Sequence, residues 1–415
     1  MSLPTDLPIP SSRRAPGAWA TLLLLATGFT LSQAFRTVAA IMAAPLQAEM
    51  HLTAQQLGMF AAAFHFAFGG LQLFMGIGID MHGLRRTVLV VSPLMVLGAV
   101  VSALATNFPV LVAGQVLIGV GCAPAFLVCT VFIARHFAAE RFSAVSSATL
   151  AVGSTGMLVT GTPLAWLIEV SSWRMGFWVL ALCAVASWVA IARWVHEPAP
   201  PAGAQRESLG EAVRTFGQLF RLPYTAGIVA LGLVTYASFV ALRGLWLGPL
   251  MMQRHGWSLV AAGNLAVVLS VVALISLPLF GRADPGPRRR RRWLVGFTLV
   301  SAALFAAMAL GIGASADVAL MLVLGLVSGF GALQYPDVKN AYEPAVIGRA
   351  MALFTMALFM GVALMQWATG AIASAAQAHG VEPFGPVFAS IAAMLAAGAL
   401  AFRWLPRPPS VTGRP

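Results

Sequence analysis

The sequence predicts an all-α membrane protein built from twelve transmembrane helices in two halves of six. The first observation is composition. The 415 residues are 59% hydrophobic and 9% charged, whereas a soluble domain carries about 25% charged residues. The second is that the apolar residues run in stretches of about 20, the length that crosses a hydrocarbon core of about 30 Å. The third is one long polar stretch that separates six apolar stretches from six.

Each predicted helix is an apolar stretch between polar breaks. The twelve stretches are 18–44, 54–79, 87–105, 109–134, 143–168, 175–195, 225–251, 258–281, 293–314, 318–337, 346–375 and 384–404. The long polar stretch after the sixth contains Pro198, Pro200 and Pro201. We therefore expect an N-terminal tail at 1–17, a first half at 18–196, a linker at 197–223, a second half at 224–405 and a C-terminal tail at 406–415.

The distribution of basic residues predicts the orientation of the chain. If the N-terminus is cytoplasmic, 21 of the 25 Lys and Arg residues fall in the tails and inner loops, and only Arg174 and Arg254 fall in outer loops. This asymmetry is typical of a multi-pass protein of the inner membrane with both termini in the cytoplasm. The net charge of +12 therefore does not indicate a nucleic-acid partner, because the basic residues lie in short clusters between apolar stretches.

Neither a cofactor nor a cleaved leader is predicted. The three cysteines, Cys122, Cys129 and Cys183, lie in apolar stretches without the spacing of metal ligands, and we expect them to be packing residues. The first apolar stretch is not followed by a small-residue cleavage site, which favours a retained helix over a signal peptide. The sequence also lacks a glycine-rich nucleotide-binding loop and a nucleophile paired with a base. We therefore expect a protein that is not an enzyme.

The two halves carry matching residues, as expected of an internal duplication. Pro45-Leu46 followed by Gly58 corresponds to Pro249-Leu250 followed by Gly263. An aspartate and an arginine cluster then follow in each half, at Asp80 and at Asp284. Each match is weak alone, but together they occur in the same order and at nearly the same spacing in the two halves.

The first of these clusters resembles a known signature. The stretch Gly76-Ile-Gly-Ile-Asp80-Met-His-Gly83-Leu-Arg85-Arg86 is similar to the pattern between helices two and three of the major facilitator superfamily. A degenerate second copy at 281–292, the helix count and the central linker agree, so the resemblance covers nearly the whole chain. It implies a secondary transporter with a central cavity between pseudo-symmetric halves and rocker-type alternating access.

The signature is expected to act as a gate at the cytoplasmic end. Its residues are Gly76, Asp80, Gly83, Arg85 and Arg86. In this prediction Asp80 pairs with basic groups or helix ends when the inner side is closed. Met81 and Leu84 stand where basic residues are common, so the gate depends on Arg85 and Arg86. The alternative is that Asp80 only caps a loop.

Two arginines, Arg36 and Arg243, fall inside helices one and seven, at similar depth. A charge at membrane depth usually faces a cavity and is functional. All 13 acidic residues fall at helix ends, in loops or in tails, so we expect the two guanidinium groups to share a face and to bind a carboxylate or phosphate of a substrate. Some organic-anion carriers of the superfamily also place arginines on these helices. In the alternative, Arg36 reaches the membrane surface or pairs with Glu49 or Glu169.

Other polar side chains at membrane depth complete the predicted site. His65, between two phenylalanines, either carries a coupling proton or is a packing residue. Trp246 either shapes the pocket wall or belongs to the interfacial aromatic belt. The remaining candidates are Gln33, Asn264, Gln334, Tyr335 and Gln366.

These observations favour a monomeric secondary carrier of a small organic anion, driven by protons or by exchange. The alternative is an efflux pump for drugs or for neutral or anionic metabolites. A cation exporter would need a buried carboxylate, and a receptor or scaffold would be expected to carry an appended signalling domain. Neither is visible in the sequence.

Overall fold

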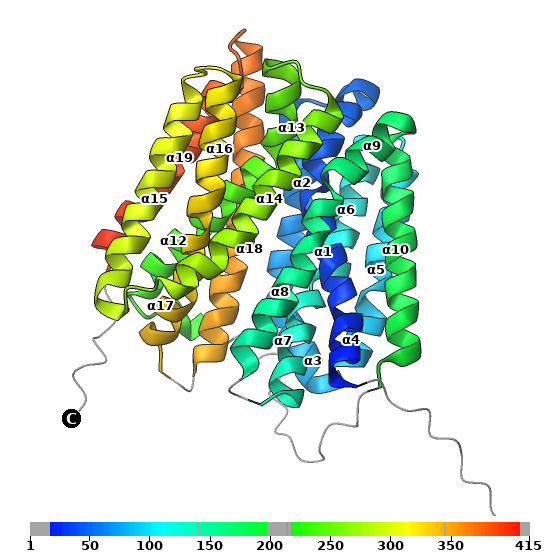
Figure 1. Cartoon of the computed structure of the whole chain (residues 1–415), viewed down its shortest axis with the longest axis vertical. Helices are drawn as coiled ribbons and strands as arrows, with labels where there is room; N and C mark the ends of the chain where they lie inside the picture. Colours follow the sequence, from blue (N-terminus) through cyan, green and yellow to red (C-terminus); the bar gives the residue numbers. More distant parts are fainter. Residues whose placement is uncertain (1–16, 139–140, 197–213, 215–216, 344–345, 407–415) are drawn as a thin grey trace, which may run out of the picture.

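The computed structural model describes residues 17–138, 141–196, 214, 217–343 and 346–406 (Figure 1). In these ranges the chain folds into helices joined by short turns. The side chains of residues 73, 80 and 142–144 lie outside the description, and so do the predicted tails and most of the predicted linker. The predicted limits of the two halves therefore remain predictions.

The first half contains ten helices that form six spans. They are α1 (Ala18–Met50), α2 (Ala54–Gly70), α3 (Gln72–His82), α4 (Leu84–Val91), α5 (Pro93–Ala103), α6 (Phe108–Cys122), α7 (Ala125–His136), α8 (Phe142–Val159), α9 (Thr162–Val170) and α10 (Trp173–Trp194). The pairs α2–α3, α4–α5, α6–α7 and α8–α9 each continue one span through a one- or two-residue break. Pro93 and Pro163 lie at the start of α5 and α9, where a missing backbone N–H costs little.

The second half repeats this arrangement in six further spans. They are formed by α12 (Thr225–Ala241) with η2 (Leu242–Trp246), α13 (Leu247–Pro249) and η3 (Leu250–Arg254), then α14 (Leu259–Arg282), α15 (Pro287–Ala309), α16 (Ala314–Val327) with η4 (Ser328–Leu333) and α17 (Gln334–Ala341), α18 (Ile347–Ala378) and α19 (Phe384–Trp404). The segments η2 and η3 are π-helical. π-Helical turns are rare in proteins, and those that occur are often found at functional sites.

The predicted fold class is confirmed. Eleven of these runs are long and apolar enough to cross a membrane, and α2 with α3 supplies the twelfth span. The two largest departures from a predicted limit are equal: the first span ends at Met50 rather than at residue 44, and the ninth begins at Pro287 rather than at residue 293. The arginines of 288–292 form its first turns, because long basic side chains at a helix end can reach the membrane surface.

Matching glycines show that the halves are related by pseudo-symmetry. Gly83 (φ 83°, ψ 166°) joins α3 to α4, and Gly286 (φ 77°, ψ 169°) precedes α15 at the corresponding turn. This backbone conformation is essentially restricted to glycine. Gly58 on α2 lies against Gly370 on α18, and Gly263 on α14, its predicted counterpart, lies against Gly161 just before α9.

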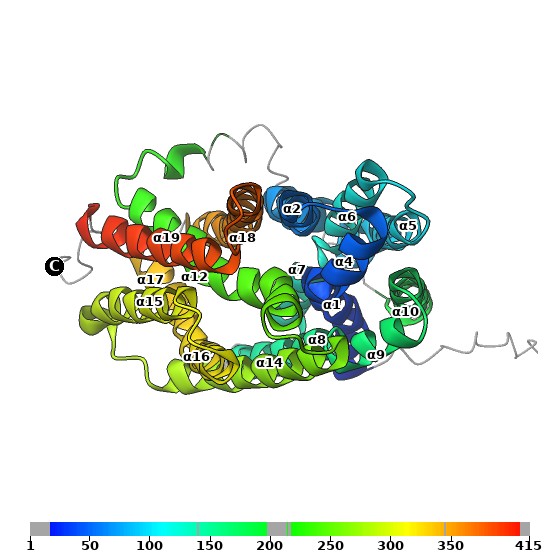
Figure 2. The same cartoon turned by 90° about the horizontal axis from the view of Figure 1, so that it is seen from above.

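The two halves meet along two seams, which Figure 2 shows from above. In one seam α2 packs against α18, and in the other α8 and α9 pack against α14. Between the seams, α1 packs against η2 and α13. We call the first the α2–α18 seam and the second the α8–α14 seam.

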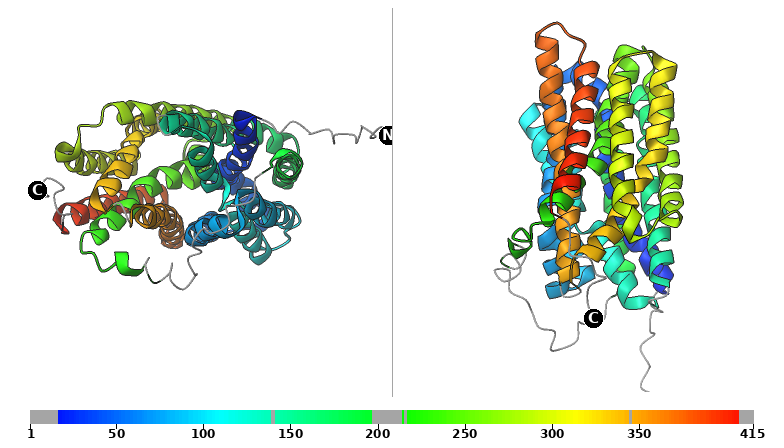
Figure 3. Two further views of the ribbon diagram at one scale, coloured as in Figure 1. Left: turned by 90° about the horizontal axis from the view of Figure 1, so that it is seen from below. Right: turned by 90° about the vertical axis from the view of Figure 1, so that its left-hand side faces the viewer.

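The contacts between the halves are concentrated toward one end of the bundle. We call the end where α1 begins and α19 ends the termini side, and the opposite end, where α18 turns into α19, the far side (Figure 3). On the far side Gln253 Nε2 donates to Gln47 Oε1 (2.9 Å), and the Gln55 backbone N–H donates to Ser374 Oγ (2.7 Å). On the termini side α3 contacts α18, whereas α4, α7 and α17 pack against elements of their own half. The structure is therefore closed on the far side.

Candidate functional site

Arg36 lies in the α2–α18 seam with 5% of its surface exposed. Its Nη1 atom donates to the Tyr236 hydroxyl on α12 at 3.0 Å. Its Nε atom is buried without a hydrogen-bond partner. Among the described residues Arg36 forms no salt bridge, since Glu49 accepts from Trp173 and Arg174, and Glu169 accepts from the Val260 backbone N–H. The seam therefore contains a buried positive charge without a carboxylate partner.

Two aromatic rings cover the guanidinium group of Arg36. Its Cζ atom lies 5.0 Å from the ring centroid of Phe68 on α2 and 4.5 Å from that of Phe359 on α18. Cation–π contacts of this kind contribute roughly 0.5–2 kcal/mol each. They orient the group and reduce its cost of burial, but they leave its net charge in place. The Nε edge of the guanidinium group has no hydrogen-bond partner.

Arg243 lies on η2 and is fully buried. Its Nε atom donates to Ala266 O (3.0 Å) and Ser270 Oγ (2.9 Å) on α14, and its Nη2 atom donates to Met157 O on α8 at 2.8 Å. Nη1 has no partner. Because Met157 belongs to the other half, Arg243 joins the two halves directly.

The sequence led us to expect that the two arginines share a face, and this prediction is wrong. Arg36 points into the α2–α18 seam, whereas Arg243 points into the α8–α14 seam. The two seams lie on opposite sides of α1 (Figure 2). The pseudo-symmetry explains this result, because each arginine lies between the second span of its own half and the fifth span of the other. Equivalent positions in two halves related by a two-fold axis point to opposite sides of that axis.

His65 and Gln366 lie in the same seam as Arg36. His65 is 1% exposed, and its Nδ1 atom lies 3.1 Å from Ala61 O, while Nε2 has no partner. Gln366 on α18 is fully buried, and both polar atoms of its amide lack partners. The α2–α18 seam therefore holds three unpartnered polar atoms of His65 and Gln366 in addition to Arg36 Nε.

The other predicted site residues are divided among different places. Gln33 is buried one turn before Arg36, and its Oε1 atom has no partner. Gln334 is buried and donates to Thr235 Oγ1 at 2.8 Å. Tyr335 is 42% exposed and packs against Phe354. Gln33 lies on α1, and Gln334 and Tyr335 lie on α17.

Two predicted residues lie away from Arg36. Trp246 donates to Thr369 Oγ1 at 3.0 Å and packs against Phe384 of the same half. Asn264 is exposed and accepts a hydrogen bond from Thr162 at 2.5 Å in the α8–α14 seam. Both are expected to support packing of the helices rather than to contact a ligand of Arg36.

The predicted gate residues lie at the termini side of the first half. Arg85 donates to Ala192 O on α10 at 2.8 Å, and Arg86 is exposed. Gly83 provides the turn between α3 and α4, and Gly76 is part of α3. The side chain of Asp80 lies outside the described residues. The gating role therefore stays a prediction.

The second copy of the signature forms an ion pair. Arg290 Nη2 lies 2.5 Å from Asp284 Oδ2, and the Gly286 backbone N–H donates to Asp284 Oδ1. The hydrogen bond from Arg290 holds the pKa of Asp284 below its usual value. Arg291 donates to Phe402 O on α19. This hydrogen bond parallels that of Arg85 with α10, since each connects the start of the third span to the last span of the same half.

Three residues around Arg36 were missed by the sequence analysis. They are Tyr236, Phe68 and Phe359, and all three contact the guanidinium group. Tyr236 could have been found, because it lies seven residues before Arg243 on a predicted membrane helix and is polar. The two phenylalanines gave no such signal among 25 phenylalanines.

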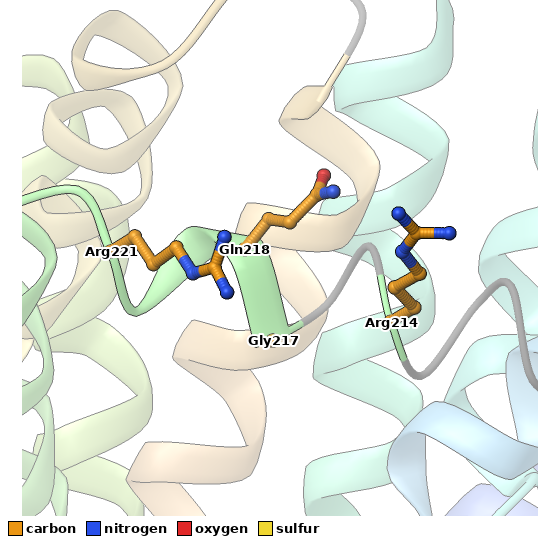
Figure 4. Close-up of a pocket in the computed structure, with 4 residues that line it drawn as sticks. All are labelled: Arg214, Gly217, Gln218 and Arg221. Atoms are coloured by element: carbon orange, nitrogen blue, oxygen red, sulfur yellow. The ribbon is translucent and has the colours of Figure 1, made fainter.

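A surface pocket lies outside this site. It has a volume of about 270 Å³ and is lined by Arg214, Gly217, Gln218 and Arg221, all of them exposed (Figure 4). These residues precede α12 in the chain. The pocket is open and contains none of the unpartnered buried groups, so it is not a second candidate.

Comparisons with known proteins agree with this architecture. The sequence profile of the Major Facilitator Superfamily matches residues 24–336. The fold is similar to the crystal structure of the nucleoside transporter NupG (15% identity, 94% of this chain and 98% of that one covered, TM-score 0.73) and to that of a D-xylose-proton symporter (16%, 94% and 98%, 0.74). It also resembles a bacterial homologue of the human lysosomal transporter Spinster in an inward-facing and occupied conformation (17%, 92% and 92%, 0.67).

No curated protein sequence gives a significant match. At these identities the solved structures establish the fold alone, whereas the profile covers about three quarters of the chain. Together with the twelve spans and the paired halves, the profile match assigns the chain. It is a multi-pass membrane transporter that belongs to the major facilitator superfamily.

Proposed function

We propose that this transporter carries a small organic anion, most simply a carboxylate, across the inner membrane by alternating access. In this proposal the termini side faces the cytoplasm and Arg36 is the principal ligand of the anion. The observation that carries it is the buried guanidinium group of Arg36, which has no carboxylate partner among the described residues and an unpaired Nε atom.

The cost of burying a charge supports this assignment. A charged side chain inside a membrane costs about 2.5–3.5 kcal/mol or more and usually faces a substrate pathway or a partner. The guanidinium group donates to Tyr236 and lies against two phenylalanine rings, and none of these neutralises its charge. A bound carboxylate would supply the missing negative charge.

Tyr236 adds a second donor beside Arg36. Its oxygen accepts from Arg36 Nη1, so its own O–H group is available to donate to another acceptor. A carboxylate accepts several hydrogen bonds and can bind a guanidinium group through two of them. Arg36 and Tyr236 together therefore suit a carboxylate better than they suit a cation.

A cationic substrate is not favoured by the same geometry. Two acidic side chains near the membrane ends, Asp317 and Glu382, form ion pairs away from Arg36. Asp317 is bound by His255 and Arg254, and Glu382 is bound by Arg254. None of these groups lies in the α2–α18 seam. This is the reason for preferring an anion carrier to an exporter of cationic compounds.

A ligand screen on the purified protein tests the proposal. Carboxylates, organophosphates and cationic dyes are added separately, and the midpoint of thermal unfolding is measured. A ligand that binds the folded state at 100 times its Kd stabilises it by about 2.7 kcal/mol. We expect at least one carboxylate to raise the midpoint of the wild type and to have no effect on Arg36→Gln.

Arg221→Gln is the matched control, because Arg221 is an exposed arginine of the surface pocket. This variant should respond as the wild type does. Stabilisation by cationic dyes alone, or an unchanged carboxylate response in Arg36→Gln, would remove Arg36 as the anion ligand.

A further inference from the structure

The first turns of α15 carry an uninterrupted run of arginines, from Arg288 to Arg292. Cations destabilise a helix N-terminus, because the helix dipole already places positive charge there. The first turn of α15 contains no acidic residue. Arg288 and Arg292 are also like charges four positions apart on one helix face, and such pairs repel. A negatively charged partner would remove this conflict.

Two arginines of the run face the interior of the second half. Arg290 is 5% exposed and donates through Nε and Nη2 to the carboxylate of Asp284. Arg291 donates to Phe402 O on α19, and its Cζ atom lies 3.9 Å from the centroid of the Phe402 ring. Asp337 on α17 lies beside Phe402 on this inner side. The acids described here therefore lie on the protein side of the run.

The other three arginines of the run, Arg288, Arg289 and Arg292, are exposed. Arg403 is exposed as well, and it directly follows Phe402, whose carbonyl group accepts from α15. In the part of the chain that the structure describes, none of these four side chains forms an ion pair or a hydrogen bond. We call Arg288, Arg289, Arg292 and Arg403 the arginine cluster. It is a concentrated positive charge where α15 packs against α19.

The neighbouring tryptophans indicate the depth of this cluster in the membrane. Trp293 directly follows the run and begins the apolar part of α15. Trp404 directly follows Arg403 and is 74% exposed. Tryptophan is enriched at the boundary between the hydrocarbon and the head groups, so the arginine cluster lies at the depth of the lipid phosphates. A guanidinium group can bind a phosphate through two parallel hydrogen bonds.

The corresponding turn of the first half lacks such a cluster. Counted from the paired glycines of the two turns, Leu89 occupies the position of Arg292. At the start of α4 only Arg86 is fully exposed, since Arg85 is half-buried and donates to Ala192 O. The pseudo-symmetric fold therefore does not require the cluster, which is a property of the second half alone.

We propose that the arginine cluster binds the head group of an anionic phospholipid in the adjacent leaflet. A lipid fits the position, because the cluster lies at the side of the bundle and at head-group depth. Val300 lies 11 residues after Arg289, which is three helical turns and so the same face of α15, and it is 44% exposed. An acyl chain can therefore lie along α15 below the cluster. This site does not depend on the ligand of Arg36.

The first test compares two equivalent positions in otherwise unchanged protein. The native cysteines are replaced, and a bimane fluorophore is attached to Val300→Cys or to Leu97→Cys, its counterpart on α5, which is 50% exposed. Quenching is measured in vesicles that contain either phosphatidylglycerol or phosphatidylcholine with brominated chains. At Val300 we expect phosphatidylglycerol to bind more tightly, by about fivefold for each arginine that contacts the head group.

The preference at Leu97 should be weaker by at least about fivefold, since only one fully exposed arginine begins α4. Equal binding of the two lipids at Val300 would overturn the proposal. The same preference at both positions would also overturn it, because the attraction would then belong to the whole membrane-facing surface rather than to the cluster.

The second test removes the charges. Arg292→Gln should lower the preference at Val300 by about fivefold, and the triple change of Arg288, Arg289 and Arg292 to Gln should reduce it to the level at Leu97. Arg193→Gln is the matched control, because Arg193 is exposed at the end of α10 as Arg403 is at the end of α19. It should leave the preference unchanged. An unaltered preference in the folded triple variant, or in all three single variants if the triple variant does not fold, would overturn the site.

Discussion

Adding one methyl group at Gly58 should open the far side of the transporter. A Cβ atom at this position of α2 would lie 2.5 Å from Gln366 O and 2.9 Å from Gly370 Cα, both on α18. Ordinary contacts begin near 3.4 Å, so α2 and α18 would have to separate by about 0.9 Å. Overpacking of this kind costs about 1–3 kcal/mol.

The cost falls only on the conformation in which the two helices touch. Since α2 and α18 belong to different halves, a conformation that separates them on the far side avoids the clash. A penalty of about 1–3 kcal/mol therefore shifts the equilibrium away from far-side closure by about 5- to 160-fold. Gly70→Ala is the control on the same helix, because nothing lies within 4 Å of a Cβ atom there.

A cysteine pair measures this closure. Gln253 Nε2 donates to Gln47 Oε1 across the halves at 2.9 Å, so a short bis-maleimide reagent should join Gln47→Cys to Gln253→Cys when the far side is closed. The three native cysteines are first replaced, and free thiols are counted by their mass shift with a maleimide polymer. We expect slow cross-linking with Gly58→Ala and rapid cross-linking with Gly70→Ala. Equal rates in two folded variants would refute the role assigned to this contact.

Three further predictions concern single groups. Arg243→Gln removes the donor to Met157 O, which should weaken far-side closure by about 1.5–3 kcal/mol and slow the same cross-link. Arg243→Lys should not restore the rate of cross-linking, because one ammonium group cannot reach acceptors on both α8 and α14. The hydrogen bond from Arg290 holds the pKa of Asp284 below the usual 3.8. The ionised carboxylate therefore stabilises the fold fully above pH 3.8, and this stabilisation is lost as the pH falls toward the lowered pKa. The thermal midpoint of Asp284→Asn should lie below that of the wild type at pH 7, and the two midpoints should converge as the pH falls below about 4. Gly83→Ala should lower the thermal midpoint, since a side chain at φ 83° costs about 1–3 kcal/mol. An unchanged midpoint would contradict the claim that this turn requires glycine.

Most of the fold could be predicted because the membrane restricts what a chain can do. Backbone groups inside lipid must be hydrogen-bonded within a helix, so a run of apolar residues already defines a span. The last span was predicted at 384–404 and found at Phe384–Trp404. Charge was a poorer guide to helix ends. Residues 288–292 looked like a loop and instead begin α15.

The site was predictable in its residue types and less so in its geometry. Buried charge identified Arg36 and Arg243, because few polar groups are tolerated at membrane depth. Their separation into two seams follows from the pseudo-symmetry of the halves, which the sequence analysis predicted but did not apply to the two arginines. Periodicity also gave no means of choosing Phe68 and Phe359 from the many phenylalanines of the chain.

Uptake into proteoliposomes tests the central claim most directly. A radiolabelled carboxylate that stabilises the wild type is supplied outside, and its entry is followed with and without Arg36→Gln. Loss of one charged hydrogen bond of about 1.5–3 kcal/mol should lower the apparent affinity by about 10- to 160-fold, while Arg221→Gln should transport normally. Uptake by Arg36→Gln at the rate and affinity of the wild type would contradict the assignment of the buried arginine as the anion ligand.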